Sequence, residues 1–283
     1  MKEKLMILRI KKILLDYQKK ERLADHEFVK EIVHIILKTY NLKRFIDEIF
    51  FFKTNKNECD AYYNPVRKEL GFSFDNVISI ITKYENFKNR IMSNEEYVFV
   101  NNVLILKNIF HEIEHVKQMK TVLINSDDLE SKLLKLEFYD AILLLSKEEY
   151  DNNYLDSYKY LLQKEELYFS KLGERLAFLN SFLIIRKILN TMKLKETILC
   201  KKVNCFDYIN NIKDFYSFKN PLYIYVDALN ELNKNYEVKC DITVDSLKEF
   251  EKELKLEERF LYGFPISEIE FKKVFEKSKK SYK

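Results

Sequence analysis

Hydrophobic residues recur with the period of a helix along most of the chain, and polar residues fill the positions between them. In the first part of the chain this pattern predicts three helices, over residues 1–20, 25–40 and 42–52. Asp25 stands where an N-cap is expected, because its short side chain can accept a hydrogen bond from the first helical turn. The polar residues 54–60 then predict a loop.

The segment from residue 61 to residue 74 has a different pattern. Ala61–Pro65 and Leu70–Phe74 are short, rich in aromatic residues, and bounded by the turn formers Pro65, Gly71 and Asn76. They predict two short strands or extended segments. An exposed edge strand here would offer backbone groups to an extended peptide.

Helical spacing resumes after residue 76. Helices are predicted over residues 77–91, 94–121, 127–146, 148–163 and 171–192. The second of these is the longest, and Ser93 supplies its N-cap, followed by Glu95 and Glu96 in the first turn. Beyond residue 193 the pattern predicts short helices that alternate with extended runs such as Leu222–Val226.

Composition favours a mostly α protein with a small β element, an α+β fold. Only three Gly and three Pro occur among 283 residues, so helix breakers are scarce. The elements fall into an N-terminal helical region (1–59), a core (60–195) and a C-terminal helical region (196–283). No low-complexity linker separates these regions, and we expect them to form one compact unit.

Charge and cysteine content argue against two functions, nucleic-acid binding and metal binding by cysteine pairs. The net charge of +4 arises from 49 basic and 45 acidic residues, which is typical of a solvated surface and does not predict nucleic-acid binding. The four Cys form no C-x-x-C pair, so reduced buried thiols are expected. The apolar run Met6–Leu15 is broken by charges, and no run reaches the roughly 18 residues of a membrane span. We therefore expect a cytoplasmic protein that does not enter membranes.

The most informative motif lies in the second half of the predicted helix 94–121. His111 and His115 flank Glu112 in the pattern H-E-x-x-H. At about 100° per residue, positions i and i+4 lie roughly 40° apart on one face of a helix, so both imidazoles can reach one metal ion. Glu112 stands beside them and can take a proton from a water that the metal holds. The motif predicts one zinc ion per chain.

A catalytic zinc requires a third protein ligand and an open position. The other two histidines, His26 and His34, precede the motif, whereas the third ligand is expected after it. Glu174 is the best candidate, because the small Ala177 follows one turn later and would let two helices approach closely. Glu165 and Glu166 are nearby competitors.

Two further side chains accompany the histidine pair. The same five residues also satisfy the inverted pattern H-x-x-E-H through Glu114, and helix geometry cannot choose between the two glutamates as general base. We favour Glu112, which leaves Glu114 as a surface carboxylate or a support for the ligands. Gln118 lies one turn past His115, where it either orients a ligand, contacts substrate, or is an ordinary polar surface residue.

These motifs resemble the ImmA/IrrE-type, gluzincin-like zinc metallopeptidases of bacteria, prophages and integrative elements. The resemblance covers residues 60–180 and rests on His111–Gln118 and Glu174–Ala177. It implies a zincin-like helical core with H-E-x-x-H on a long helix, His111, His115 and Glu174 as zinc ligands, and Glu112 as base. Two departures are Glu114, where the family usually has glycine, and the long separation between His115 and Glu174.

The sequence therefore predicts a zinc metallopeptidase, a hydrolase that cuts a protein or peptide substrate inside the cell. The resemblance further suggests a regulatory protein as substrate. The alternative is a zinc-binding helical protein without catalytic activity, in which the metal joins two helices and the chain serves as an interaction module.

Overall fold

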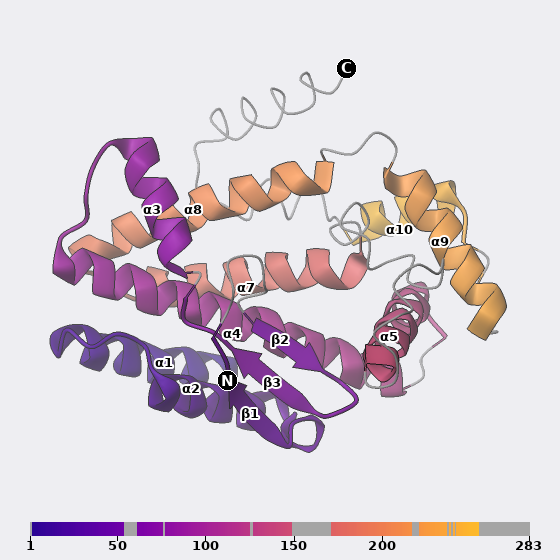
Figure 1. Ribbon diagram of the computed structural model, residues 1–283, viewed down its shortest axis with the longest axis horizontal. Coiled ribbons are helices and arrows are strands. Elements are labelled where there is room, and N and C mark those ends of the chain that lie inside the picture. Colours follow the sequence, from indigo (N-terminus) through magenta and orange to yellow (C-terminus); the bar gives the residue numbers. More distant parts are fainter. Residues whose placement is uncertain are drawn as a thin grey trace. The chain divides into compact units, whose positions relative to one another are not determined.

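The computed structural model describes residues 2–53, 61–75, 77–124, 127–148, 171–216, 221–236, 238, 240 and 242–254. Within these residues the chain is mostly helical and contains one three-stranded sheet, as Figure 1 shows. The expected fold class, mostly α with a small β element, is confirmed at this level. The predicted helix over residues 148–163 and the polar tail lie outside the described residues, apart from Glu148.

The chain divides into two compact units, and two helices run through both. The first unit comprises Met1–Val116 and Asn180–Ile209, and the second comprises Lys117–Leu179 and Asn210–Lys283. The three regions expected from the sequence are consecutive along the chain, whereas each of these two units combines two separate segments. The division into three regions stays a prediction.

The first two helices of the first unit are α1 (Lys2–Lys19) and α2 (His26–Tyr40), which pack against each other. Asp25 is the N-cap of α2, as predicted, and its side chain accepts a hydrogen bond from the Phe28 backbone N–H. The buried face of α2 has helical spacing and consists of Phe28, Val29, Ile32, Val33, Ile36 and Leu37. Burial of each large side chain contributes about 1.5–3 kcal/mol to stability.

The sheet has the strand order β1-β3-β2. β1 (Glu48–Phe51) pairs parallel with β3 (Glu69–Phe72), and β2 (Ala61–Asn64) pairs antiparallel with β3. Gly71 lies opposite Tyr62, and a Cβ atom at Gly71 would stand 2.1 Å from the Tyr62 ring, so glycine is required for this close approach.

One expectation for this part of the chain is wrong. The predicted helix over residues 42–52 is instead a short 3-10 turn, η1 (Lys43–Phe45), followed by β1. The partner that makes β1 a strand is β3, about twenty residues further along, and local periodicity cannot register such a pairing. The edge strand expected within residues 61–74 is present as β2, and β3 is the central strand of the described sheet.

α3 (Val77–Lys88) precedes α4 (Asn94–Ile124), the longest helix that the structure describes. Ser93 and Glu96 form a capping box at the start of α4: the Ser93 hydroxyl accepts from the Glu96 N–H, and the Glu96 carboxylate accepts from the Ser93 N–H. Residues on several sides of α4 are fully buried, which identifies it as a central helix. α8 (Lys195–Tyr216) lies against it through a buried ion pair between Lys107 and Asp207.

The second unit contains α5 (Leu129–Glu148), α9 (Pro221–Tyr236) and α10 (Val244–Glu253), and α9 contacts both of the others. The Asp128 side chain caps α5 by accepting from the Ser131 N–H. The extended run predicted over Leu222–Val226 is wrong, because these residues lie in the first turns of α9. Pro221 at the first helical position starts this helix despite the β-branched and aromatic residues that follow.

α7 (Leu172–Asn190) matches the strongly apolar helix expected over residues 171–192. None of the helices in the described part of the chain has both the length and the apolar character that crossing a membrane requires.

Candidate metal centre

His111 and His115 point their rings toward one another from successive turns of α4. Their Nε2 atoms are 3.2 Å apart, and the ring planes are inclined by 80°. Two nitrogen ligands at 2.0–2.1 Å from a tetrahedral zinc ion stand about 3.3 Å apart. The spacing of the pair is therefore that of two ligands to one ion. Without a metal, the same distance fits an N–H···N hydrogen bond between the two imidazoles.

Glu174 completes a group of three possible ligands. One ligand atom each from His111, His115 and Glu174 can be chosen so that all lie within 4.8 Å of one another. Glu174 is only 8% exposed, in the first turn of α7, where the positive end of the helix dipole favours a carboxylate. A largely buried His/His/Glu group that could hold a metal ion is thus present, and it contains the three residues named from the sequence.

The residue before Glu174 is a glycine for a steric reason. A Cβ atom at Gly173 would lie 2.8 Å from Glu137 Oε2 and 3.1 Å from Gln118 Oε1. Ala177, the small residue on which the prediction relied, is fully buried. Residues 173 and 177 are therefore both small. The absence of a side chain at Gly173 makes room for the Glu137 and Gln118 side chains next to Glu174.

Glu112 and Glu114 have different surroundings. Glu112 is 5% exposed and follows His111 directly, next to the buried Ile113. Glu114 is half-buried, and its Oε1 accepts a hydrogen bond of 2.8 Å from the Asn180 side-chain amide on α7. Glu114 is thus engaged in joining two helices.

Gln118 is buried, so it is not an ordinary surface residue. Its side-chain amide donates a hydrogen bond of 2.8 Å to the carbonyl oxygen of Gly173, the residue before Glu174. This contact fixes the backbone from which the third candidate ligand projects.

Sequence reasoning missed two residues beside this backbone, Glu137 of α5 and Tyr225 of α9. The Glu137 carboxylate accepts from the Leu172 N–H at 2.6 Å and from the Gly173 N–H at 2.9 Å, and the Tyr225 hydroxyl donates to Glu137 Oε1. Glu137 is 6% exposed and Tyr225 is completely buried. One signal was available: Glu137 falls on the apolar stripe of α5, one turn after Leu133 and Leu134, where a carboxylate needs partners.

Burial is the main influence on the pKa values of Glu137 and Tyr225. It raises the pKa of Glu137 above its ordinary value, and the hydrogen bonds from Tyr225 and from the Gly173 and Leu172 N–H groups oppose that shift. All three contacts are donated to the carboxylate, which is the arrangement that suits its ionised form. Burial raises the pKa of Tyr225 well above its ordinary value, so its hydroxyl keeps the proton that it donates.

Other residues weighed in the sequence do not join the group. His26 stacks on Phe51, with ring centroids 3.9 Å apart, and His34 is exposed on α2. Cys200 and Cys240 are buried, as expected. Glu165 and Glu166, the competitors for the third ligand, lie outside the described residues.

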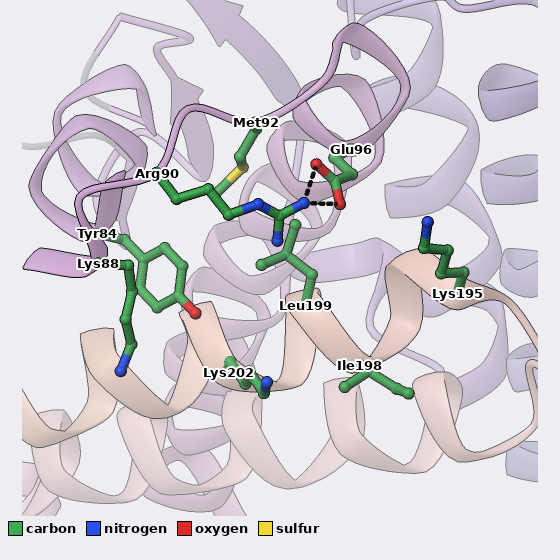
Figure 2. Close-up of a pocket in the computed structure, with 9 residues that line it drawn as sticks. All are labelled: Tyr84, Lys88, Arg90, Met92, Glu96, Lys195, Ile198, Leu199 and Lys202. Carbon is green, nitrogen blue, oxygen red and sulfur yellow. Dashed lines mark hydrogen bonds and ion pairs between the residues drawn. The ribbon is translucent and has the colours of Figure 1, made fainter. Parts of the chain in front are cut away.

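A pocket of about 460 Å³ in the first unit is formed by other residues, shown in Figure 2. It is lined by Tyr84, Lys88, Arg90, Met92, Glu96, Lys195, Ile198, Leu199 and Lys202. Inside it the Arg90 guanidinium points at Glu96 and donates to both carboxylate oxygens, at 2.7 and 3.0 Å. These contacts hold Glu96, whose carboxylate caps the start of α4. The pocket therefore lies at the N-terminal end of the helix that carries His111 and His115.

No protein-family model, curated protein or solved structure matches the chain. Functional inference therefore depends on the residues and geometry of the metal group itself.

Proposed function

We propose that this protein is a zinc-dependent peptidase that hydrolyses a peptide bond in a protein substrate, with Glu112 as general base. The observation that carries the proposal is the 3.2 Å spacing of the His111 and His115 Nε2 atoms beside Glu174, in a chain whose motif also places a glutamate directly after the first ligand. That combination of donors and base is the one that metal-assisted hydrolysis needs.

The donor set suits zinc better than a harder cation. Two imidazoles and one carboxylate make three protein ligands, which leaves one position of a tetrahedron open for water or substrate. Magnesium and calcium prefer six or more oxygen ligands, whereas this group offers two nitrogens. Each chain would hold one ion.

Zinc in this position would supply Lewis acidity, which polarises a substrate carbonyl and makes a coordinated water acidic near neutral pH. The protein's own contribution falls to Glu112. Its carboxylate takes a proton as water adds to the carbonyl carbon, and it returns that proton to the departing amine nitrogen as the C–N bond breaks. Glu112 is assigned this role over Glu114 because it is the glutamate of the direct H-E-x-x-H pattern, immediately after His111.

The substrate is proposed to bind in an extended form. β2 is an edge strand of the described sheet and has β3 on one side. A segment of substrate could add to its other side through backbone hydrogen bonds, which gives affinity with little dependence on side chains. A regulatory protein as substrate, and a location inside the cell, rest on the resemblance to the ImmA/IrrE-type enzymes alone.

The decisive experiment compares two glutamates that are two residues apart. The zinc-loaded protein is incubated with a mixture of unstructured peptides, and new peptide termini are counted by mass spectrometry. Glu112→Gln should bind zinc with unchanged stoichiometry and lose cleavage, since an amide cannot take the proton. Glu114→Gln keeps an oxygen that can accept from Asn180 and should retain most of the activity.

The opposite result would reverse the assignment. If Glu114→Gln is inactive while Glu112→Gln still cleaves, the inverted motif is the correct one. If neither the wild-type protein nor any variant produces new termini although zinc is bound, the non-catalytic zinc-binding alternative replaces the peptidase.

A further inference from the structure

Helix α7 begins in an unusual way, because a side chain from another helix caps it. A helix leaves its first backbone N–H groups without partners inside the helix, and a residue just before the helix commonly supplies one acceptor. At α7 the acceptors are both oxygens of Glu137, which belongs to α5 and is 35 residues away from Leu172 in sequence. The N–H groups of Leu172 and Gly173 are thus bound to one buried carboxylate.

Tyr225 fixes that carboxylate in turn. Its hydroxyl donates to Glu137 Oε1 and accepts a longer hydrogen bond, 3.3 Å, from the Leu172 N–H, so it contacts both the carboxylate and the start of α7. Tyr225 is on α9, which packs against α5. The side chains of Glu137 and Tyr225, together with the two N–H groups, are called the α7 cap below.

The α7 cap surrounds the backbone that presents Glu174. On one side Glu137 binds the Gly173 N–H, and on the other side Gln118 binds the Gly173 carbonyl oxygen. Both polar groups of the residue before Glu174 are therefore held by buried side chains. A Cβ at Gly173 would lie 2.8 Å from Glu137 Oε2 and 3.1 Å from Gln118 Oε1, so both side chains lie against this residue.

We infer that Glu137 and Tyr225 are positioning residues for the metal centre: they set the place and direction of Glu174, and thereby the affinity of the site for zinc. The inference rests on the proposed function, because it takes Glu174 as a zinc ligand. Groups that orient a ligand without touching the metal typically change metal affinity by about 10–100-fold when they are removed.

The structure offers a matched control for this kind of contact. At the start of α2, Asp25 accepts from the Phe28 N–H, and the Tyr17 hydroxyl donates to the same Asp25 oxygen at 3.1 Å. Tyr17→Phe therefore removes the same chemistry as Tyr225→Phe, a tyrosine hydroxyl on a capping carboxylate, at a helix that carries none of the three candidate ligands.

The test uses the full chain and three measurements on each variant: zinc Kd by competition with a chromophoric chelator, amide hydrogen exchange at the start of α7 in the zinc-free protein, and free energy of unfolding in urea. Tyr225→Phe should weaken zinc binding about tenfold, and Glu137→Gln by more, toward about 100-fold. Both should speed exchange at Leu172 and Gly173. Tyr17→Phe should lower stability and leave the zinc Kd unchanged.

Equal zinc Kd values for wild type, Tyr225→Phe and Glu137→Gln would overturn the inference even if stability falls, because the cap would then be structural only. If Glu137→Gln does not fold, the milder Tyr225→Phe decides the question by its zinc Kd. A failure of the proposed function gives a different result. If the wild-type protein binds zinc tightly but cleaves no peptide, the peptidase proposal is wrong, whereas the positioning role of Glu137 and Tyr225 is still supported by the zinc Kd values. If wild type binds no zinc, both fall.

Discussion

Gln118 and Gly173 are joined by a hydrogen bond of 2.8 Å from the Gln118 side-chain amide to the Gly173 carbonyl oxygen. Gln118 lies three residues after His115, and Gly173 directly precedes Glu174. The bond therefore links the positions next to two of the three candidate ligands. Both partners are buried, and the Gly173 carbonyl lies in the first turn of α7, so the bond ties α4 to the start of α7.

Gln118→Leu should lower stability by about 0.5–1.5 kcal/mol, the usual net contribution of one hydrogen bond. It should also weaken zinc binding, because the Glu174 backbone gains freedom. Urea unfolding and a zinc competition titration measure the two effects. Leu123→Ala, at a residue 57% exposed on the same helix, is the control and should change neither. A Gln118→Leu protein with wild-type zinc affinity would contradict the role given to this bond.

Gly173→Ala should destabilise the protein by about 1–3 kcal/mol, although alanine is the better helix former. The added methyl group would lie 2.8 Å from Glu137 Oε2 and 3.1 Å from Gln118 Oε1, and both side chains are buried and hydrogen-bonded. Thermal and urea unfolding provide the measurement. An increase in stability would show that propensity prevails and that the two polar groups can move aside.

The ion pair of Lys107 and Asp207, 2.5 Å long and with both side chains under 10% exposed, supports the histidine-bearing helix from α8. Asp207→Asn alone should cost about 3–5 kcal/mol, because Lys107 is left buried without its counter-charge. Lys107→Met combined with Asp207→Leu should recover most of that loss. Urea unfolding of the two single variants and the double variant tests this, and a single-variant cost below about 1 kcal/mol would show that the pair is solvated.

Glu96 should give the start of α4 a stability that depends on pH. The Ser93 backbone N–H, together with Arg90, lowers the pKa of Glu96 below its ordinary 4.5, although burial opposes the shift. A group with a lowered pKa in the folded state stabilises the protein above its ordinary pKa, and this contribution is lost as pH falls through the lowered value. Glu96→Gln should therefore be less stable than wild type at neutral pH, with a difference that shrinks as the pH falls below the ordinary pKa of Glu96.

The control for this prediction is Glu95→Gln, an exposed residue in the same first turn of α4. It tests whether the helix dipole alone produces the effect. Free energies of unfolding for the three proteins are compared at several pH values. If the Glu95 and Glu96 variants behave alike, the capping box does not carry the pH dependence.

The sequence predicted the fold well wherever a signal was local. α2, α4, α5 and α7 follow from helical spacing together with capping residues such as Asp25, Ser93 and Asp128. β1 could not be predicted in this way, because its strand partner β3 lies about twenty residues away and its own residues are compatible with a helix. The extended run predicted over Leu222–Val226 was wrong for the opposite reason, because strand-forming residues occur there inside a helix that Pro221 begins.

The residues of the candidate site also differ in whether a local sequence signal predicts them. His111 and His115 were predictable because the geometry of a single helix brings them together. Glu174 was predicted through Ala177, the small and fully buried residue one turn later, since close packing leaves a trace in the sequence. Glu137 and Tyr225 were not found, because a buried carboxylate that caps a distant helix is identified by its partners, which are 35 and 88 residues away.

If His111, His115 and Glu174 hold one zinc ion together, X-ray absorption at the zinc edge will detect their ligand atoms around the metal. The protein with one equivalent of zinc should show two imidazole nitrogens and oxygen ligands at about 2.0–2.2 Å, without sulfur. His115→Ala should lose one imidazole from that sphere, and the exposed His34→Ala should match wild type. Sulfur scattering, or an imidazole count that His115→Ala leaves unchanged, would contradict the account.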